Sequence, residues 1–202
     1  MKLRNAEKRL LIAVSQIIEN EGFSKIGVNK IAKQAKCDKV LIYRYFSGLE
    51  GLLAAWAKDN DFYTLAYQAY SERVTKAESS EDIIKLTQTV LLKQLNFLRT
   101  NKLMQELLAW ELSGNSTFRS IQNERERNCF KLQEELEKKL GKESKDVRMF
   151  ITILIASINY IVLTTRQYRI FNGIDFSNPE AWELCKQTIY KYIRALFENI
   201  LK

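Results

Sequence analysis

Apolar residues recur at intervals of three or four positions along most of this 202-residue chain, which is the spacing of amphipathic helices. Near the N-terminus this spacing predicts one helix over about 5–20, stopping at Gly22, and a second over about 28–35. A third helix is expected to begin near Asp38, whose carboxylate can cap the free N–H groups, and to break at Ser47-Gly48. The first fifty residues therefore hold three short helices joined by tight turns.

The remaining chain has the pattern of longer helices separated by glycine, proline and capping residues. Asn178-Pro179 is expected to begin the last helix, because a proline in the first helical position loses no hydrogen bond. The other expected helices span 49–70, 80–98, 102–112, a polar stretch from 114–116 to Leu140, and an apolar stretch from Ser144 to about Asn172-Gly173. The pattern predicts about nine helices.

The composition also favours an all-α fold. A single Pro and seven Gly leave few residues for the many turns of a β-sandwich. The uncharged run 149–165 is shorter than the roughly 20 mainly apolar residues of a membrane span. We therefore expect no membrane partner, and a helix buried on most sides within the protein.

Positive charge is concentrated near the N-terminus. The chain has 32 basic and 24 acidic residues, a formal net charge of +8, and residues 1–50 contain ten of the basic and five of the acidic ones. This distribution favours a polyanionic partner. Three widely spaced cysteines, Cys37, Cys129 and Cys185, suggest neither disulfides nor a metal site, and the N-terminus lacks a signal-peptide pattern, so we expect a cytoplasmic protein.

The sequence CDKVLIYRYF, from Cys37 to Phe46, combines aromatic and charged residues whose directions can be predicted with a helical wheel. Ile42 and Phe46 share the face that would pack inward. The residues on the outer face and its flanks are Val40, Arg44, Tyr43 and Tyr45. The cluster therefore does not form a single aromatic face.

Such a helix suits insertion into the major groove of DNA. Arg44 can form a bidentate contact with guanine, worth about 1–3 kcal/mol of discrimination, and Tyr43 and Tyr45 can donate hydrogen bonds to phosphates. Neighbouring lysines that would add salt-dependent affinity are Lys30, Lys33, Lys36 and Lys39. The alternative is that the tyrosines are ordinary packing residues and the lysines a solvated surface.

The segment from Leu10 to Leu53 resembles the N-terminal DNA-binding domain of TetR-family transcriptional regulators. The matching positions are Glu21-Gly22-Phe23, Val28, Ile31-Ala32, Ala35, Lys39, Ile42-Tyr43, Tyr45-Phe46, Glu50 and Leu52-Leu53. The resemblance implies a three-helix helix-turn-helix domain at 1–48 and a larger helical domain for effector binding and dimerisation at 49–202. It further implies a homodimeric repressor that binds a palindromic double-stranded DNA operator and is released by a small-molecule effector.

The resemblance also assigns residues to the DNA surface. Tyr43 and Tyr45 match ring positions that contact phosphates in the family, and Asn29 matches a polar position at the start of the second helix. The positions that match the groove-facing side of the recognition helix are Val40, Leu41 and Arg44. Lys30 and Lys39, from the basic surface, complete the predicted DNA-binding set.

Three positions depart from the family pattern. Lys36 stands where the turn usually has glycine, and Asp38 stands where Ser or Thr is usual, which places an acid near the expected phosphates. Leu49 replaces a lysine that commonly contacts phosphate at the start of the fourth helix. We expect that phosphate contact to be missing.

The last two predicted helices have apolar positions at helical spacing, as expected for a two-fold four-helix bundle between two copies of the chain. The residues predicted to lie in this dimer interface are Ile153, Ile189, Ile193, Leu196, Phe197 and Ile200. The alternative is that both helices pack only against their own domain.

For the effector the sequence offers a set of candidates, while no cofactor or metal ion is expected. These candidates are Phe97, Met104, Trp110, Cys129, Asn159 and Tyr160. Aromatic and methionine side chains usually fill space in a core, so packing is the alternative for most of them. Asn159 lies in an otherwise apolar helix and needs a hydrogen-bond partner, either a ligand or a neighbouring helix.

The competing hypothesis is a helical protein that binds or acts on a small apolar molecule without binding DNA. An enzyme is not expected, because the sequence contains no His, no Gly-rich phosphate loop and no recognisable pairing of a nucleophile with a base.

Overall fold

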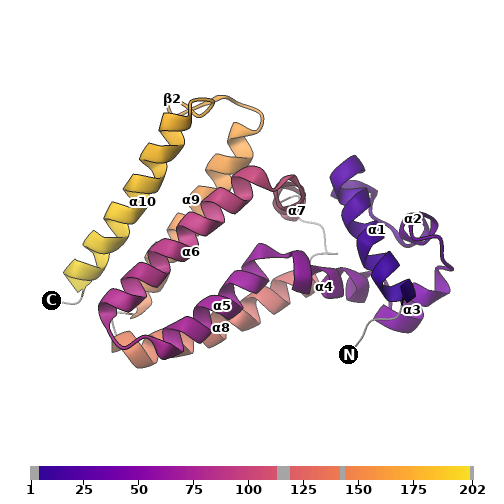
Figure 1. The fold of residues 1–202 in the computed structure, drawn as a ribbon, viewed down its shortest axis with the longest axis horizontal. Coiled ribbons are helices and arrows are strands. Elements are labelled where there is room, and N and C mark those ends of the chain that lie inside the picture. The colour runs from indigo at the N-terminus through magenta and orange to yellow at the C-terminus, as the bar shows by residue number, and fades with distance from the viewer. Residues whose placement is uncertain (1–4, 113–118, 142–143, 201–202) are drawn as a thin grey trace. The chain divides into compact units, whose positions relative to one another are not determined.

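The computed structural model describes residues 5–112, 119–141 and 144–200 (Figure 1). As predicted, the fold is all-α: the described residues form ten α-helices, a short 3-10 helix and one two-stranded hairpin. The chain divides into two compact units, unit 1 with residues 1–65 and 101–127 and unit 2 with residues 66–100 and 128–202. The functional division predicted at residue 48 stays a prediction.

Unit 1 is organised around α1, whose apolar face packs against the helices that follow it. Its elements are α1 (Asn5–Glu21), η1 (Phe23–Lys25), α2 (Val28–Gln34), α3 (Val40–Phe46), α4 (Leu49–Asn60) and α7 (Lys102–Glu111). Trp56 of α4 is buried, and its indole Nε1 donates to Ser15 Oγ of α1 at 2.9 Å. Because a buried indole N–H needs an acceptor, this bond fixes the position of α4 on α1.

The region expected to form one helix over 49–70 is two helices, because the chain breaks at Asp61. Asp61 has extended backbone angles, and its Oδ2 accepts hydrogen bonds from Thr64 N at 2.9 Å and Thr64 Oγ1 at 2.7 Å. An aspartate in this position caps the free N–H groups of a new helix, α5 (Phe62–Lys76). The apolar periodicity continues across the break, which is why the pattern alone did not predict it.

Unit 2 contains most of α5 and its longer partners, with α6 packing against both α9 and α10. Its further elements are α6 (Ser80–Thr100), the larger part of α8 (Arg119–Leu140), α9 (Ser144–Thr165), β1 (Ile170–Phe171), β2 (Ile174–Asp175) and α10 (Pro179–Ile200). The predicted start of α8 at 114–116 lies outside the described residues. Asn178 Oδ1 accepts from Glu180 N at 3.0 Å, so the last helix begins with the expected cap.

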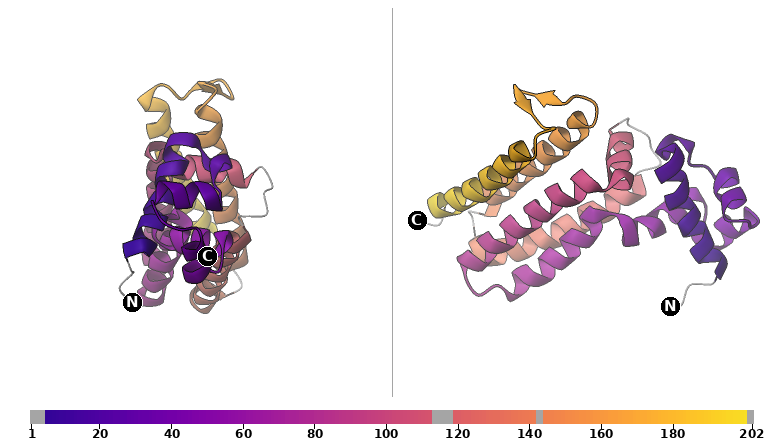
Figure 2. Two further views of the ribbon diagram at one scale, coloured as in Figure 1. Left: turned by 90° about the vertical axis from the view of Figure 1, so that its right-hand side faces the viewer. Right: turned by 45° about the horizontal axis from the view of Figure 1, so that its top comes forward.

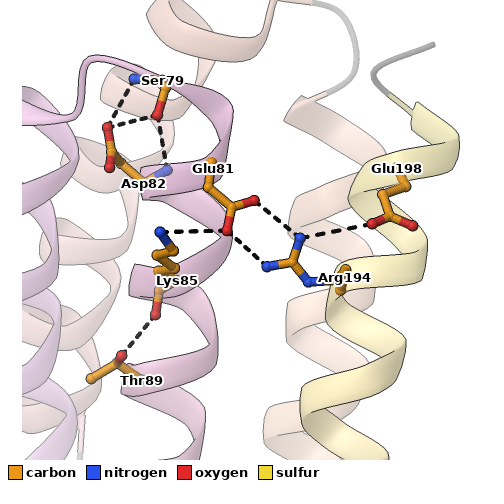
Figure 3. A network of polar contacts seen from close by, with 7 residues as sticks. All are labelled: Ser79, Glu81, Asp82, Lys85, Thr89, Arg194 and Glu198. Carbon is orange, nitrogen blue, oxygen red and sulfur yellow. Dashed lines mark hydrogen bonds and ion pairs between the residues drawn. The ribbon is translucent and has the colours of Figure 1, made fainter.

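A fork of hydrogen bonds joins α10 to α6 near one end of unit 2 (Figure 3). The Arg194 guanidinium donates to both carboxylate oxygens of Glu81, at 3.1 and 2.8 Å. These hydrogen bonds hold the pKa of Glu81 below its usual value. In the turn before α6, Ser79 and Asp82 bond to each other and close the helix start.

The chain between α9 and α10 was predicted to be helical as far as about residue 172, and this is wrong. Helix α9 ends at Thr165, and an antiparallel hairpin follows, with Ile170 opposite Asp175 and Phe171 opposite Ile174 (Figure 2). Asn172 and Gly173 form its turn with φ of 50° and 76°. Two positive φ angles in an Asn-Gly pair are typical of a tight hairpin turn, not of the helix stop predicted at this pair.

Helix α9 was also predicted to be buried on most sides, and within a single chain it is not. Its buried residues are Ser144, Val147, Ile158 and Val162. By length and composition α9 could span a membrane, with a mean hydropathy of 1.9 over 18 residues, of which 17% are buried within the chain. The exposed part includes the apolar side chains of Met149, Ile153 and Tyr160.

Stability should fall at alkaline pH through the buried phenol of Tyr70. Thr87 Oγ1 donates to Ile83 O at 2.8 Å, so it accepts the 2.5 Å hydrogen bond from Tyr70, and burial raises the pKa of Tyr70 to about 12. The phenol of the unfolded chain titrates near pH 10. The stabilisation is therefore fully present below about pH 10, and the free energy of unfolding should fall by up to about 3 kcal/mol as the pH rises towards 12. Urea unfolding of wild type and Tyr70→Phe from pH 8 to 12 measures this. The two proteins should lose different amounts of stability above pH 10, and parallel curves would contradict the assignment.

Candidate nucleic-acid interface

Three short helices at the start of unit 1, α1–α3, form a helix-turn-helix head. Ile42 of α3 is fully buried, and α3 contacts both α1 and α4. Phe46, the second residue predicted to face inward, is half-buried. The inner side of α3 is thus fixed by apolar packing, which determines which of its side chains face outward.

The outward side of α3 carries the side chains that the wheel predicted there. Val40 and Tyr43 are 59% and 57% exposed, and Arg44 is also exposed. Leu41 and Tyr45 are half-buried, and the Tyr45 ring meets Phe46 edge-on at 6.5 Å between centroids. Tyr45 is therefore partly a packing residue, although it was predicted to face outward. Val40, Tyr43 and Arg44 are exposed to solvent.

The turn between α2 and α3 has both of the unusual features that the sequence suggested. Lys36 has a φ of 51°, a left-handed conformation that costs a non-glycine residue about 1–2 kcal/mol. Asp38 Oδ1 accepts from Val40 N at 2.9 Å, so the carboxylate caps the first turn of α3. The turn is closed further by Cys37 N, which donates to Ala32 O at 3.1 Å.

The lysines on this side of the head differ in their surroundings. Lys33, Lys36 and Lys39 are exposed, as is Asn29 at the start of α2. Lys30 forms an ion pair with Glu21 at the end of α1, so its charge is partly compensated. The exposed lysines flank α3. They would attract an anionic partner, and this attraction would weaken as the salt concentration rises.

The junction of α3 and α4 contains a close approach that the sequence pattern does not predict. A Cβ added to Gly51 would lie 1.7 Å from the carbonyl oxygen of Phe46, where real Cβ atoms keep more than 3.0 Å. Ser47 and Gly48 precede it with φ of 60° and 115°. Only glycine at position 51 lets the first turn of α4 lie against the end of α3. In the sequence, this close approach is marked only by a single Gly within a helical pattern.

Unit 1 also contains a buried network of charges. Arg125 of α8 donates to Asp61 from Nε at 2.9 Å and from Nη2 at 2.5 Å, and its Nη1 donates to Glu111 at 2.7 Å. Burial alone would lower the pKa of Arg125, but the hydrogen bonds and charges of Asp61 and Glu111 outweigh it and raise that pKa. The guanidinium also lies 4.7 Å from the centre of the Tyr63 ring. The network joins the α4–α5 break to α7 and α8.

The predicted effector residues are divided between the two units. Met104 is buried in α7 of unit 1, and Trp110 lies against Phe23 with ring centroids 4.4 Å apart. In unit 2, Asn159 accepts a hydrogen bond from Gln94 Nε2 at 3.0 Å, which is the neighbouring-helix alternative. The remaining candidates in unit 2 are Phe97 and Cys129, both half-buried, and Tyr160, which is exposed and meets Phe171 edge-on.

Three of the residues predicted for a dimer interface are buried within the single chain. Ile189, Ile193 and Phe197 are buried on α10, which packs against α6 and α9 of the same chain. Ile153 is 54% exposed and Leu196 is half-buried, while the side chain of Ile200 lies outside the described residues. An apolar stripe indicates that a helix face is covered, but it does not say by which partner.

Comparison with known proteins agrees with this geometry. Residues 11–56 match the family model described as bacterial regulatory proteins, tetR family. No curated protein sequence matches the chain. Similar folds occur in a TetR-family transcriptional regulator from Streptomyces coelicolor, with 14% identity, a TM-score of 0.60 and coverage of 98% of this chain and 91% of that one.

Two further solved structures share the fold over nearly the whole chain. One is the fatty acid degradation regulator FadR from Bacillus halodurans, with 17% identity, a TM-score of 0.58 and coverage of 100% of this chain and 97% of that one. The other is NalD from Pseudomonas aeruginosa, the secondary repressor of a multidrug efflux pump, with 15% identity, a TM-score of 0.61 and coverage of 92% and 94%. The head at residues 11–56 thus matches the tetR family of bacterial regulatory proteins, and the chain as a whole shares its fold with these regulators.

Proposed function

We propose that this protein is a ligand-responsive repressor that binds a palindromic operator as a homodimer in the cytoplasm and is released by a small-molecule effector. The observation that carries the DNA-binding part is the outward side of α3, where Val40, Tyr43 and Arg44 stand exposed above a fully buried Ile42. A helix of this kind fits the major groove, and Arg44 can read a guanine edge while Tyr43 donates to a phosphate. Repression by NalD and regulation by FadR support the same class of function.

The double variant Tyr43→Ala, Arg44→Ala tests DNA binding. With DNA from immediately upstream of the protein's own coding sequence, wild type should bind in a sequence-selective way, and its affinity should fall steeply as salt increases. The double variant should bind at least about ten-fold more weakly, because a bidentate arginine contact alone contributes about 1–3 kcal/mol. Fluorescence anisotropy across a salt series measures both quantities.

A matched control is available just before the hairpin of unit 2. Tyr168 and Arg169 are the same residue types in the same order and both are exposed, so Tyr168→Ala, Arg169→Ala removes the same groups far from α3 in sequence. This control should bind DNA like wild type. Equal, weak and non-selective binding by all three proteins would contradict the regulator and favour the alternative, a helical protein that binds a small apolar molecule without DNA.

The homodimer is supported by an apolar stripe on α9 that the single chain leaves exposed. Met149, Ile153 and Tyr160 are more than half exposed, and their spacing puts them on one side of the helix. Leu184 and Tyr192 of α10 are exposed in the same unit. Contiguous exposed apolar surface of this kind marks an interaction site, and a second copy that presents the same stripe would cover it with two-fold symmetry.

Replacing Ile153 with glutamate should convert the dimer to a monomer. The substitution would bury a carboxylate against its own symmetry mate, and an unpaired buried charge costs several kcal/mol. Thr152→Glu is the control, since Thr152 is exposed on the same helix but lies to the side of the stripe. Light scattering after size exclusion should give monomer for Ile153→Glu and dimer for wild type and Thr152→Glu. A monomeric wild type, or a dimeric Ile153→Glu protein, would contradict the interface.

A further inference from the structure

Val40, the first residue of α3, has an apolar side chain that the head leaves largely uncovered. The residue is 59% exposed, and its backbone N donates to Asp38 Oδ1 at 2.9 Å, which fixes the first turn of the helix. In a helix a valine side chain keeps essentially one χ1 rotamer, so its two methyl groups point in a constant direction. Helix α3 therefore presents a rigid apolar group on its outer side.

Such a group has one apolar complement in the major groove of DNA. The base edges there present hydrogen-bond donors and acceptors, and the C5-methyl group of thymine is the apolar group among them. In a helix-turn-helix protein the N-terminal residues of the recognition helix contact base edges, and Val40 occupies that position in α3. The side chain of Val40 is thus placed to distinguish thymine from the other bases.

The charges at this end of α3 also favour base edges over the DNA backbone. Asp38 is exposed, and a phosphate would repel its carboxylate, whereas the amino group of a base can donate to it. Lys36 and Lys39, on either side of Asp38 in the sequence, are exposed as well and can bind the phosphates that border the groove. These charges direct the first turn of α3 towards the bases.

The distance from Val40 to Arg44 sets the spacing of the two bases that they would contact. Arg44 is exposed and follows Val40 by one helical turn on the same outer side of α3. Four residues rise about 6 Å along a helix, and successive base pairs are about 3.4 Å apart. A helix that lies along the groove therefore places the two contacts about two base pairs apart.

We propose that Val40 contacts the C5-methyl group of a thymine in each half-site of the operator, about two base pairs from the guanine that Arg44 contacts. This inference rests on the proposed function, because it concerns the DNA that the regulator would bind. It adds a specificity-determining residue to the DNA surface, and it specifies two bases of the half-site and the spacing between them.

The first test is selection of binding sites from random double-stranded DNA by the full-length protein. The selected half-sites should contain a thymine and a guanine about two base pairs apart, and the half-sites should be repeated with two-fold symmetry. Selected sites that lack a thymine at this distance from a guanine would overturn the proposal.

The second test replaces the selected thymine with deoxyuridine, which pairs in the same way but lacks the C5-methyl group. In fluorescence anisotropy, wild type should bind about four-fold more weakly for each half-site changed. This ratio corresponds to about 0.8 kcal/mol, the contribution of one buried CH₂ group. Equal affinity of wild type for the two duplexes would contradict the methyl contact.

Val40→Ala tests whether residue 40 makes this contact. The variant should bind the thymine and deoxyuridine duplexes with the same affinity, close to that of wild type for deoxyuridine. Ile12→Ala is the matched control, because it shortens another apolar side chain of the head, which is 55% exposed on α1. This control should keep the wild-type ratio between the two duplexes. If Val40→Ala also keeps that ratio, another residue contacts the methyl group and the assignment to Val40 is wrong.

The guanine contact is tested with 7-deazaguanine, which lacks the N7 acceptor. Wild type should bind this duplex at least about five-fold more weakly, since a bidentate arginine contact contributes about 1–3 kcal/mol, and Arg44→Ala should bind both duplexes equally. Arg44→Ala should still prefer thymine to deoxyuridine, because contacts at separate base pairs are roughly additive. An unchanged affinity of wild type for the 7-deazaguanine duplex would overturn the paired contacts.

The same measurements separate this inference from the proposed function. Sequence-selective binding by wild type without any effect of deoxyuridine would overturn the thymine contact and leave the regulator standing. Non-selective binding by wild type would overturn both, because there is then no operator whose bases could be read.

Discussion

Replacing Arg125 with leucine should lower the free energy of unfolding by about 3–5 kcal/mol, because it leaves a buried carboxylate without its counter-charge. Asp61 is fully buried, and Arg125 holds both of its carboxylate oxygens at 2.9 and 2.5 Å. The same change removes the partner of Glu111 and the contact with the Tyr63 ring. Urea unfolding followed by tryptophan fluorescence measures the loss, with Trp56 and Trp110 reporting on unit 1.

A control for this prediction lies two residues along the same helix. Arg127 also forms an ion pair, with Glu124 at 2.6 Å, but its side chain is 68% exposed. Exposed pairs within one helix contribute little, so Arg127→Leu should change the free energy of unfolding by less than about 0.5 kcal/mol. Adding Asp61→Asn to Arg125→Leu should recover part of the loss, since asparagine removes the charge and can still accept from Thr64. Equal losses in the two single variants would show that the network is not buried in solution.

This network also illustrates what the sequence could not provide. Asp61 and Arg125 are 64 positions apart, and the chain contains 32 basic and 24 acidic residues, so nothing in the pattern selects this pair. By contrast, the directions of Ile42, Val40 and Arg44 followed from the period of a helix alone. Local periodicity fixes which face of an element is covered, and long-range pairing depends on the fold.

The same distinction explains the result on α10. The spacing of Ile189, Ile193 and Phe197 correctly indicates a covered face, but the helices that pack against α10 are α6 and α9 of the same chain. On α9, the packing of the chain decides which apolar side chains stay exposed. Ile153 is the one predicted interface residue in that exposed stripe. Periodicity alone thus could not show whether an apolar helix face packs against a second copy of the chain or against the chain's own helices.

Replacing Gly51 with alanine should lower the free energy of unfolding by about 3 kcal/mol, because the new methyl group has no space. It would lie 1.7 Å from the carbonyl oxygen of Phe46 and 2.9 Å from its carbonyl carbon, so helix α3 or α4 must move. Overpacking of this kind typically costs 1–3 kcal/mol, and here the obstacle is backbone, which cannot rotate away as a side chain can. Displacing α3 should also weaken operator binding, since Val40, Tyr43 and Arg44 would lose their fixed direction.

Gly27→Ala is the matched control, because it adds the same methyl group to the same head. The new Cβ would have no heavy atom within 4 Å, and the φ of −175° at Gly27 is extended backbone that alanine adopts without strain. Its free energy of unfolding should change by less than about 1 kcal/mol, since the gain from restricting the unfolded chain is opposed by the poorer N-cap that alanine gives α2. Urea unfolding and fluorescence anisotropy with operator DNA on both variants measure the two effects. If Gly51→Ala is as stable as Gly27→Ala and binds DNA equally well, α4 does not lie against the end of α3, and the close approach does not fix the recognition helix.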